Sequence, residues 1–417
     1  MSSPHARLPL SPRRLFREVF AYWAQERRTV RQGLTALAIS TCVGLAAGLV
    51  LGFMEELLAA LPGLLMLIPA AIGMRGAIFG ALGARLGTAI LTGQFDGSLA
   101  RDSFGRQNLA AAAALTLYSS ALAALAARAV AALFGLPSVS VWKLMVISVV
   151  GGVLASSVIA VMVVLLARSA LSRNWDMDAV GAPLVTTTGD IVTLPALIVA
   201  TLLIRNETFA TGAGVVLLLA AAAAVAAGLR AGGDLTRRIC RQSLTVLSYA
   251  ALVDVLAGGV LEAQVEAFLT TPALLVLIPP FIANCGSLGG ILSARLGSEL
   301  HLGLITPRRL PERQANLEGS LAVLFSIAAF GGVGLSAHLV SVLAGFDSPG
   351  LATMVGIALL GGALAFLLLF AVAYYVAVAT YRFGLDPDNY GIPVVTATMD
   401  FFGVLCLVAA ILIFGVN

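Results

Sequence analysis

The sequence predicts an all-α polytopic membrane protein made of two parallel five-helix repeats joined by a linker transmembrane helix. Composition excludes a soluble fold, because 59% of the 417 residues are hydrophobic and only 11% are charged, whereas soluble domains have about 25% charged residues. The apolar residues form long runs, such as LMVISVVGGVLASSVIAVMVVLLA at 144–167. About 20 such residues cross a bilayer as a helix. A repeat at an offset of 210 residues defines the two units.

The first predicted element is an amphipathic helix at 11–31. Ser11 suits the N-cap position and Pro12 the first helical position. Such a helix lies on the membrane surface or packs on the protein's own cytoplasmic face, and the sequence leaves both open. Eleven apolar segments follow, at 33–60, 64–90, 109–134, 142–168, 180–204, 212–229, 243–268, 273–297, 316–343, 351–380 and 391–415.

The distribution of basic residues predicts the orientation. The N-terminal segment has seven arginines, and the loops on its side of the membrane hold most of the others. The opposite side has little beyond Arg128, Lys143 and Arg205. The positive-inside rule therefore places the N-terminus in the cytoplasm, and eleven crossings place the C-terminus outside. We expect an integral protein of the plasma membrane.

The repeat is visible in two distant blocks of sequence. Residues 64–93 and 274–303 share 14 of 30 positions without a gap, including Pro69 and Pro279. The blocks DMDAVGAPLVTTTGD at 176–190 and DPDNYGIPVVTATMD at 386–400 match at the same offset. One offset for two blocks indicates a duplication rather than shared apolar composition.

The helix count predicts how the repeats are related. Each unit has five crossings, and the segment at 212–229 has no counterpart, so the units start six crossings apart and enter the membrane in the same direction. We expect a cytoplasmic segment at 1–32, a first repeat at 33–205, a linker helix and loop at 206–242, and a second repeat at 243–417. Because one chain holds both units, a monomer can form a complete pathway.

Asp190 and Asp400 are the strongest candidates for an ion site. Each lies about ten residues, or roughly 15 Å, into its helix. An ionised aspartate at that depth costs several kcal/mol unless it is hydrated or paired, so it indicates function. Two equivalent carboxylates repel each other, and a divalent cation between them removes the repulsion; a buried, protonated or hydrogen-bonded pair with a packing role is the alternative. Thr186 and Thr396 lie one turn earlier on the same helix face, where their hydroxyls can meet the water shell of an ion or bond to the preceding turn.

Further residues are predicted to line or lead to a pathway. Pro69 and Pro279, with glycines such as Gly73 after them, predict interrupted or kinked helices, whose freed backbone groups must face a cavity or other protein; close helix packing is the alternative. Acidic mouths that attract cations are expected at two ends of the pathway, although acidic residues also favour helix N-termini. The remaining candidates are Thr188 and Thr398 on the pathway wall, Asp176, Asp178, Asp386, Asp388 and Asn389 at the cytoplasmic mouth, and Glu56 and Glu266 at the outer one.

The blocks at 69–89, 182–195 and 386–400 resemble the membrane domain of the MgtE magnesium channels, and more closely the solute carrier family 41 proteins, which hold two such domains in one chain. The resemblance implies that Asp190 and Asp400 coordinate hydrated Mg²⁺ and that the second and fifth helices of each unit line the pore. The first unit lacks the asparagines of the MgtE pattern, but Asn284 is present in the second. The large cytoplasmic regulatory domains of bacterial MgtE have no counterpart in the short segment before the first span.

We therefore predict a divalent-cation transporter, with Mg²⁺ as the transported ion and the lipid bilayer as its surroundings. Mg²⁺ is often held through water by one or two carboxylates. Two alternatives remain, a secondary transporter of an organic solute and an intramembrane aspartyl protease, whose dyad would share a proton. Duplication of the whole unit argues against the protease, so no enzyme is expected. The basic residues behind the net charge of +4 are scattered over short loops, which excludes nucleic acid as a partner. The four cysteines form no CxxC pair.

Overall fold

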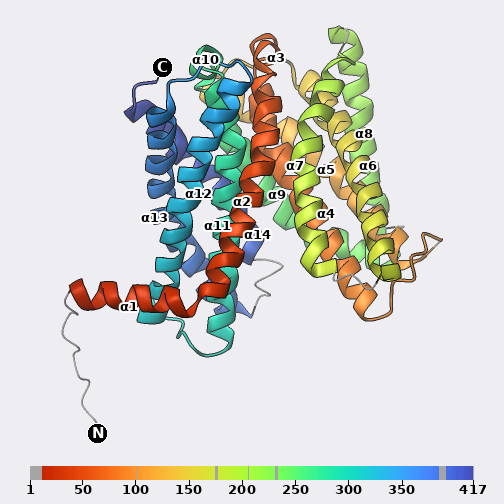
Figure 1. The fold of residues 1–417 in the computed structure, drawn as a ribbon. Coiled ribbons are helices and arrows are strands. Elements are labelled where there is room, and N and C mark those ends of the chain that lie inside the picture. Colours follow the sequence, from red (N-terminus) through yellow and green to blue (C-terminus); the bar gives the residue numbers. More distant parts are fainter. Residues whose placement is uncertain are drawn as a thin grey trace.

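The computed structural model is an all-helical bundle (Figure 1). It describes residues 12–100, 102–173, 177–204, 206–230, 233–384 and 391–416, with backbone alone at 12–16, 172–173, 177–184 and 186–187. The helices are α1 (Pro12–Gln25), α2 (Arg27–Gly52), α3 (Glu55–Ala60), α4 (Leu64–Leu91), α5 (Phe104–Phe134), α6 (Val141–Arg173), α7 (Met177–Thr201), α8 (Glu207–Arg230), α9 (Asp234–Glu262), α10 (Val265–Thr270), α11 (Ala273–His301), α12 (Arg313–Leu343), α13 (Leu351–Phe383) and α14 (Ile392–Ile413).

The predicted set of membrane helices is confirmed. Within the described residues, ten helices are long and apolar enough to cross a membrane. The eleventh, α7, has 25 residues and is apolar over Thr188–Thr201. The end of α14 and the helix α1 lie at opposite ends of the bundle (Figure 1), as an odd number of crossings requires.

The two repeats have matching elements. The bounds of α3 and α10, and those of α6 and α13, differ by the same offset that relates the sequence blocks. α2 matches α9, α4 matches α11, α5 matches α12 and α7 matches α14 to within a few residues, while α8 has no counterpart. The parallel arrangement and the linker helix predicted from the sequence are thus confirmed.

The first helix of each repeat packs mainly on the other repeat. α2 lies against α11 and α12, and α9 lies against α4 and α5. A Cβ atom on Gly48 of α2 would lie 2.3 Å from the carbonyl oxygen of Val276, and one on Gly258 of α9 would lie 2.4 Å from that of Met66. These equivalent contacts need glycine because the helix backbones meet. The exchange joins both repeats in one buried apolar core.

Two predicted segments are divided in the structure. The apolar run at 33–60 ends as a helix at Gly52 and resumes as the short α3, and the run at 243–268 likewise breaks before α10. α3 and α10 contact each other at the end of the bundle opposite α1 (Figure 1). In both repeats the break falls between equivalent helices, so the two short helices form the same kind of turn.

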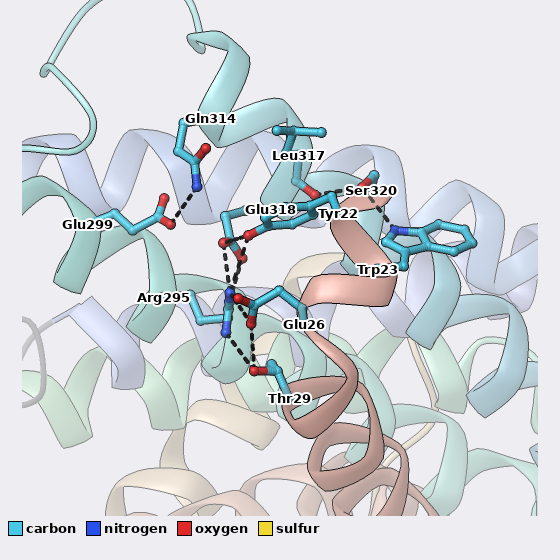
Figure 2. Close-up of polar contacts among 10 residues, drawn as sticks. All are labelled: Tyr22, Trp23, Glu26, Thr29, Arg295, Glu299, Gln314, Leu317, Glu318 and Ser320. Atoms are coloured by element: carbon cyan, nitrogen blue, oxygen red, sulfur yellow. Dashed lines mark hydrogen bonds and ion pairs between the residues drawn. The ribbon is translucent and has the colours of Figure 1, made fainter. Parts of the chain in front are cut away.

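The N-terminal helix packs on the protein's own surface. Tyr22 donates a hydrogen bond to Glu318 of α12, and Trp23 Nε1 donates one to Ser320 Oγ at 3.1 Å (Figure 2). Burial, with the hydrogen bond to Glu318, raises the pKa of the Tyr22 hydroxyl, which therefore stays protonated and remains a donor. Of the two sequence interpretations, the structure supports packing on the protein, with Phe20 left exposed.

Arg295 of α11 is the centre of this contact. It pairs with Glu318, whose side chain is fully buried, and with Glu26 at 3.3 Å (Figure 2). Its equivalent in the first repeat, Arg85, donates instead to the neutral Asn108 at 2.8 Å. In the second repeat the arginine therefore holds α1, α11 and α12 together.

Candidate cation site

Of the two candidate aspartates, Asp400 is the one that lies where the repeats meet. Asp190 on α7 and Asp400 on α14 are equivalent positions, and each helix packs against the second helix of its own repeat, α4 or α11. The Asp400 carboxylate is 3.2 Å from the point that a Cβ on Gly286 of α11 would occupy, and 3.8 Å from the corresponding point on Gly73 of α4. It therefore lies between helices of different repeats.

The aspartates form an electrostatically linked group. The charge of Asp400 interacts with that of Asp190, and the charge of Asp254 interacts with that of Asp400. Asp190 and Asp400 are half-buried, whereas Asp254 is 1% exposed. Among the described side chains, no group of three or more His, Cys, Asp or Glu is arranged to hold a metal ion directly.

Asp254 is a residue that the sequence analysis did not select. It lies on α9, and its Oδ2 atom is 2.6 Å from the point that a Cβ on Gly73 would occupy. The sequence contains a signal for it, because Asp254 is an isolated carboxylate in the middle of an apolar segment. Comparison of positions 210 residues apart does not reveal Asp254, because the equivalent position in the first repeat is Gly44.

The threonines near the aspartates are bonded within and between helices. Thr396 Oγ1 donates to the Pro393 carbonyl at 3.1 Å, and Thr188 Oγ1 to Met162 Sδ at 2.9 Å. Thr398 shares a 2.7 Å hydrogen bond with Tyr249 of α9. The side chain of Thr186 lies outside the described residues.

The prolines do not interrupt their helices. α4 continues through Pro69 and α11 through Pro279, and both prolines are buried. An interrupted helix at these positions, one of the two forms expected from the sequence, is therefore wrong. Asn284 of α11 is also buried, and its Nδ2 atom donates to Thr41 Oγ1 of α2 at 3.0 Å, which ties the two repeats together.

The acidic mouths are only partly described. Glu56 and Glu266 are exposed on α3 and α10, which contact each other, so the predicted outer pair lies on neighbouring elements. Asp176, Asp386, Asp388 and Asn389, and the side chain of Asp178, lie outside the described residues.

Arg75 is a deeply buried basic residue of α4. It is 2% exposed, and its guanidinium donates to Ser120 Oγ at 2.7 Å and to the Ala71 carbonyl at 3.0 Å. No acidic residue forms an ion pair with it within the described part of the chain. The side chain points towards α5 and α6, where a Cβ on Gly152 would lie 2.0 Å from it.

Comparison with known proteins identifies the family. The family model MgtE, described as a divalent cation transporter, matches residues 68–200 and 278–410. In each repeat the match covers the third and fourth long helices completely (α5 and α6, α12 and α13) and most of the second and fifth (α4 and α7, α11 and α14). Helices α2, α8 and α9 lie outside the matches. No match was found among curated proteins or among solved structures. The two matches cover more than half of the chain, and it belongs to the MgtE family of divalent cation transporters, with two copies of the family's domain fused in one membrane protein.

Proposed function

We propose that this transporter moves Mg²⁺ across the plasma membrane through a pathway at the interface of the two repeats, with Asp190 and Asp400 as the ion-binding carboxylates. The observation on which this rests is the position of Asp400, which interacts with Asp190 and lies between α4 and α11. Both aspartates are half-buried rather than fully enclosed. A hydrated ion at this interface meets carboxylates of both repeats.

The choice of Mg²⁺ follows from its coordination chemistry. Mg²⁺ dehydrates reluctantly, keeps several waters and is usually bound by one or two carboxylates. Thr396 would contact that water shell, since its hydroxyl donates to its own helix and still accepts hydrogen bonds from water. Thr186, at the equivalent position, would do the same in this proposal. MgtE is a transporter family rather than an enzyme family, and the ion is substrate rather than cofactor.

The remaining proposed residues guide the ion to this pair. Orientation by the positive-inside rule gives a cytoplasmic N-terminus and an external C-terminus, so Glu56 and Glu266 would attract cations outside and the acidic residues before α7 and α14 inside. The pathway wall would include Pro69, Gly73, Pro279, Asn284, Thr188 and Thr398. A single chain supplies both repeats, so the transporting unit is a monomer in this proposal.

Uptake by proteoliposomes that hold the purified protein tests the proposal. Mg²⁺, Mn²⁺, Ca²⁺ and Zn²⁺ are compared as substrates, with Asp190→Asn beside the wild type and Asp234→Asn as a control, because Asp234 is fully exposed at the start of α9. We expect Mg²⁺ uptake that Asp190→Asn reduces and Asp234→Asn leaves unchanged. Uptake that prefers another of these ions would reject Mg²⁺, and uptake indifferent to Asp190→Asn would reject the site.

A further inference from the structure

Asp254 is a buried carboxylate without a partner that satisfies it. Its side chain is 1% exposed, and its Oδ1 atom has no hydrogen-bond partner among the described residues. A buried polar atom without a partner is destabilising, and more so if it is charged. The residue lies on α9, outside the segments that the family model matches, so the family assignment gives it no role.

The packing around Asp254 is shaped for a carboxylate. Its Oδ2 atom lies 2.6 Å from the point that a Cβ on Gly73 would occupy, so a larger residue at position 73 would displace it. Asp400 approaches the same point at 3.8 Å. The two carboxylates therefore face one position on α4 from two different helices, α9 and α14, and their charges interact.

The second copy of this interface lacks the arrangement. The equivalent of Asp254 is Gly44 on α2, where a Cβ would lie only 2.4 Å from Pro280 Cα and a carboxylate has no room. The equivalent of Gly73 is Ala283. Gly73 leaves space for a carboxylate and Asp254 fills that space, and this combination occurs only where α9 meets α4.

We propose that Asp254 is a third carboxylate of the cation site, which it makes asymmetric by holding the hydrated ion on the side where α9 meets α4. The inference rests on the proposed site at Asp190 and Asp400. A divalent cation here offsets the repulsion between Asp254 and Asp400 and satisfies the free oxygen through its water shell. An extra carboxylate also raises the preference for a divalent over a monovalent cation, because attraction scales with the charge of the ion.

The test uses the full chain in proteoliposomes with Asp254→Asn, Asp254→Gly and the control Asp234→Asn. Asp254→Asn keeps the shape of the side chain, and Asp254→Gly installs the residue that the other repeat has. We expect the Mg²⁺ concentration for half-maximal uptake to rise about tenfold or more in both variants, a loss of about 1.4 kcal/mol in binding, and to stay unchanged in Asp234→Asn.

A second readout does not depend on transport. Mg²⁺ that binds the folded protein raises its thermal midpoint in detergent, and Asp254→Asn should reduce this rise while Asp234→Asn keeps it. The proposal of a third carboxylate would be overturned if a folded Asp254 variant had the same half-saturating Mg²⁺ concentration as the wild type and the same Mg²⁺-induced rise in thermal midpoint. If Asp190→Asn still reduces uptake in that case, the paired site stands. If neither Asp190→Asn nor the Asp254 variants affect uptake, the proposed site itself fails.

Discussion

Gly258 of α9 lies against Met66 of α4, so closely that a Cβ on the glycine would be 2.4 Å from the Met66 carbonyl oxygen. The equivalent contact, Gly48 against Val276, joins α2 to α11. Without apolar driving force between helices in lipid, close backbone packing through small residues is a principal source of association. These two contacts hold each repeat's first helix on the opposite repeat.

Replacing either glycine with alanine should therefore separate the repeats. We expect Gly258→Ala and Gly48→Ala each to cost about 1–3 kcal/mol of stability, as other overpacking substitutions do, and to lower the thermal midpoint in detergent. Gly332→Ala on α12 is the control, because nothing lies within 4 Å of its added Cβ. Equal midpoints for the three variants would show that the backbones are not in contact.

Gly73→Ala should inhibit transport without unfolding the protein. The new methyl group would lie 2.6 Å from Asp254 Oδ2. The Asp254 side chain can relieve this clash by moving, so the fold survives. We expect the movement to take the carboxylate away from Asp400. We expect Mg²⁺ uptake to fall about tenfold, a change of about 1.4 kcal/mol in the transport barrier. Gly83→Ala on the same helix is the control, since its Cβ would make ordinary contact with Val185 at 3.7 Å.

The effect of Gly73→Ala should depend on Asp254. If the methyl group acts by displacing this carboxylate, adding Asp254→Gly should cancel the further loss, so the double variant transports as Asp254→Gly alone does. Such non-additivity is what a double-mutant cycle measures between residues in contact. Strictly additive losses would place the defect elsewhere.

Arg295→Met should release α1. Removing the guanidinium leaves the buried Glu318 carboxylate without its cation, and breaking a buried ion pair in this way costs about 3–5 kcal/mol. We expect a lower thermal midpoint and faster hydrogen exchange over residues 17–26. The matched control is Arg85→Met, which removes the equivalent arginine from a neutral partner, Asn108, and should cost less. A smaller effect for Arg295→Met than for Arg85→Met would contradict the network in Figure 2.

Much of the fold follows from the sequence because a bilayer permits few solutions. Hydropathy located the ten helices of the described residues that can cross a membrane, together with α7. The common offset gave the parallel repeats, and only helices or closed barrels satisfy the backbone in lipid. The exchange of α2 and α9 between repeats was not predictable, because hydropathy defines a span and not its neighbours. The breaks after Gly52 and Glu262 were missed because the apolar pattern continues through them.

The candidate site was predictable only as far as it is symmetric. Comparing the repeats selected Asp190 and Asp400, and the structure brings their charges into interaction. Asp254 was not selected, because its place beside Gly73 depends on contact between α9 and α4, which are far apart in sequence. Pro69 illustrates the opposite error: proline often breaks helices in water, but α4 continues through it because a membrane helix near its N-terminus tolerates the lost hydrogen bond.

The most direct test of the central claim is Mg²⁺ uptake by proteoliposomes that hold the Asp190→Asn, Asp400→Asn double variant, matched to the wild type for incorporated protein and thermal midpoint. Both substitutions keep side-chain size and remove only the negative charge. If the paired carboxylates bind the transported ion, uptake by the double variant falls to that of empty liposomes. Uptake at the wild-type rate from a folded double variant would contradict the account.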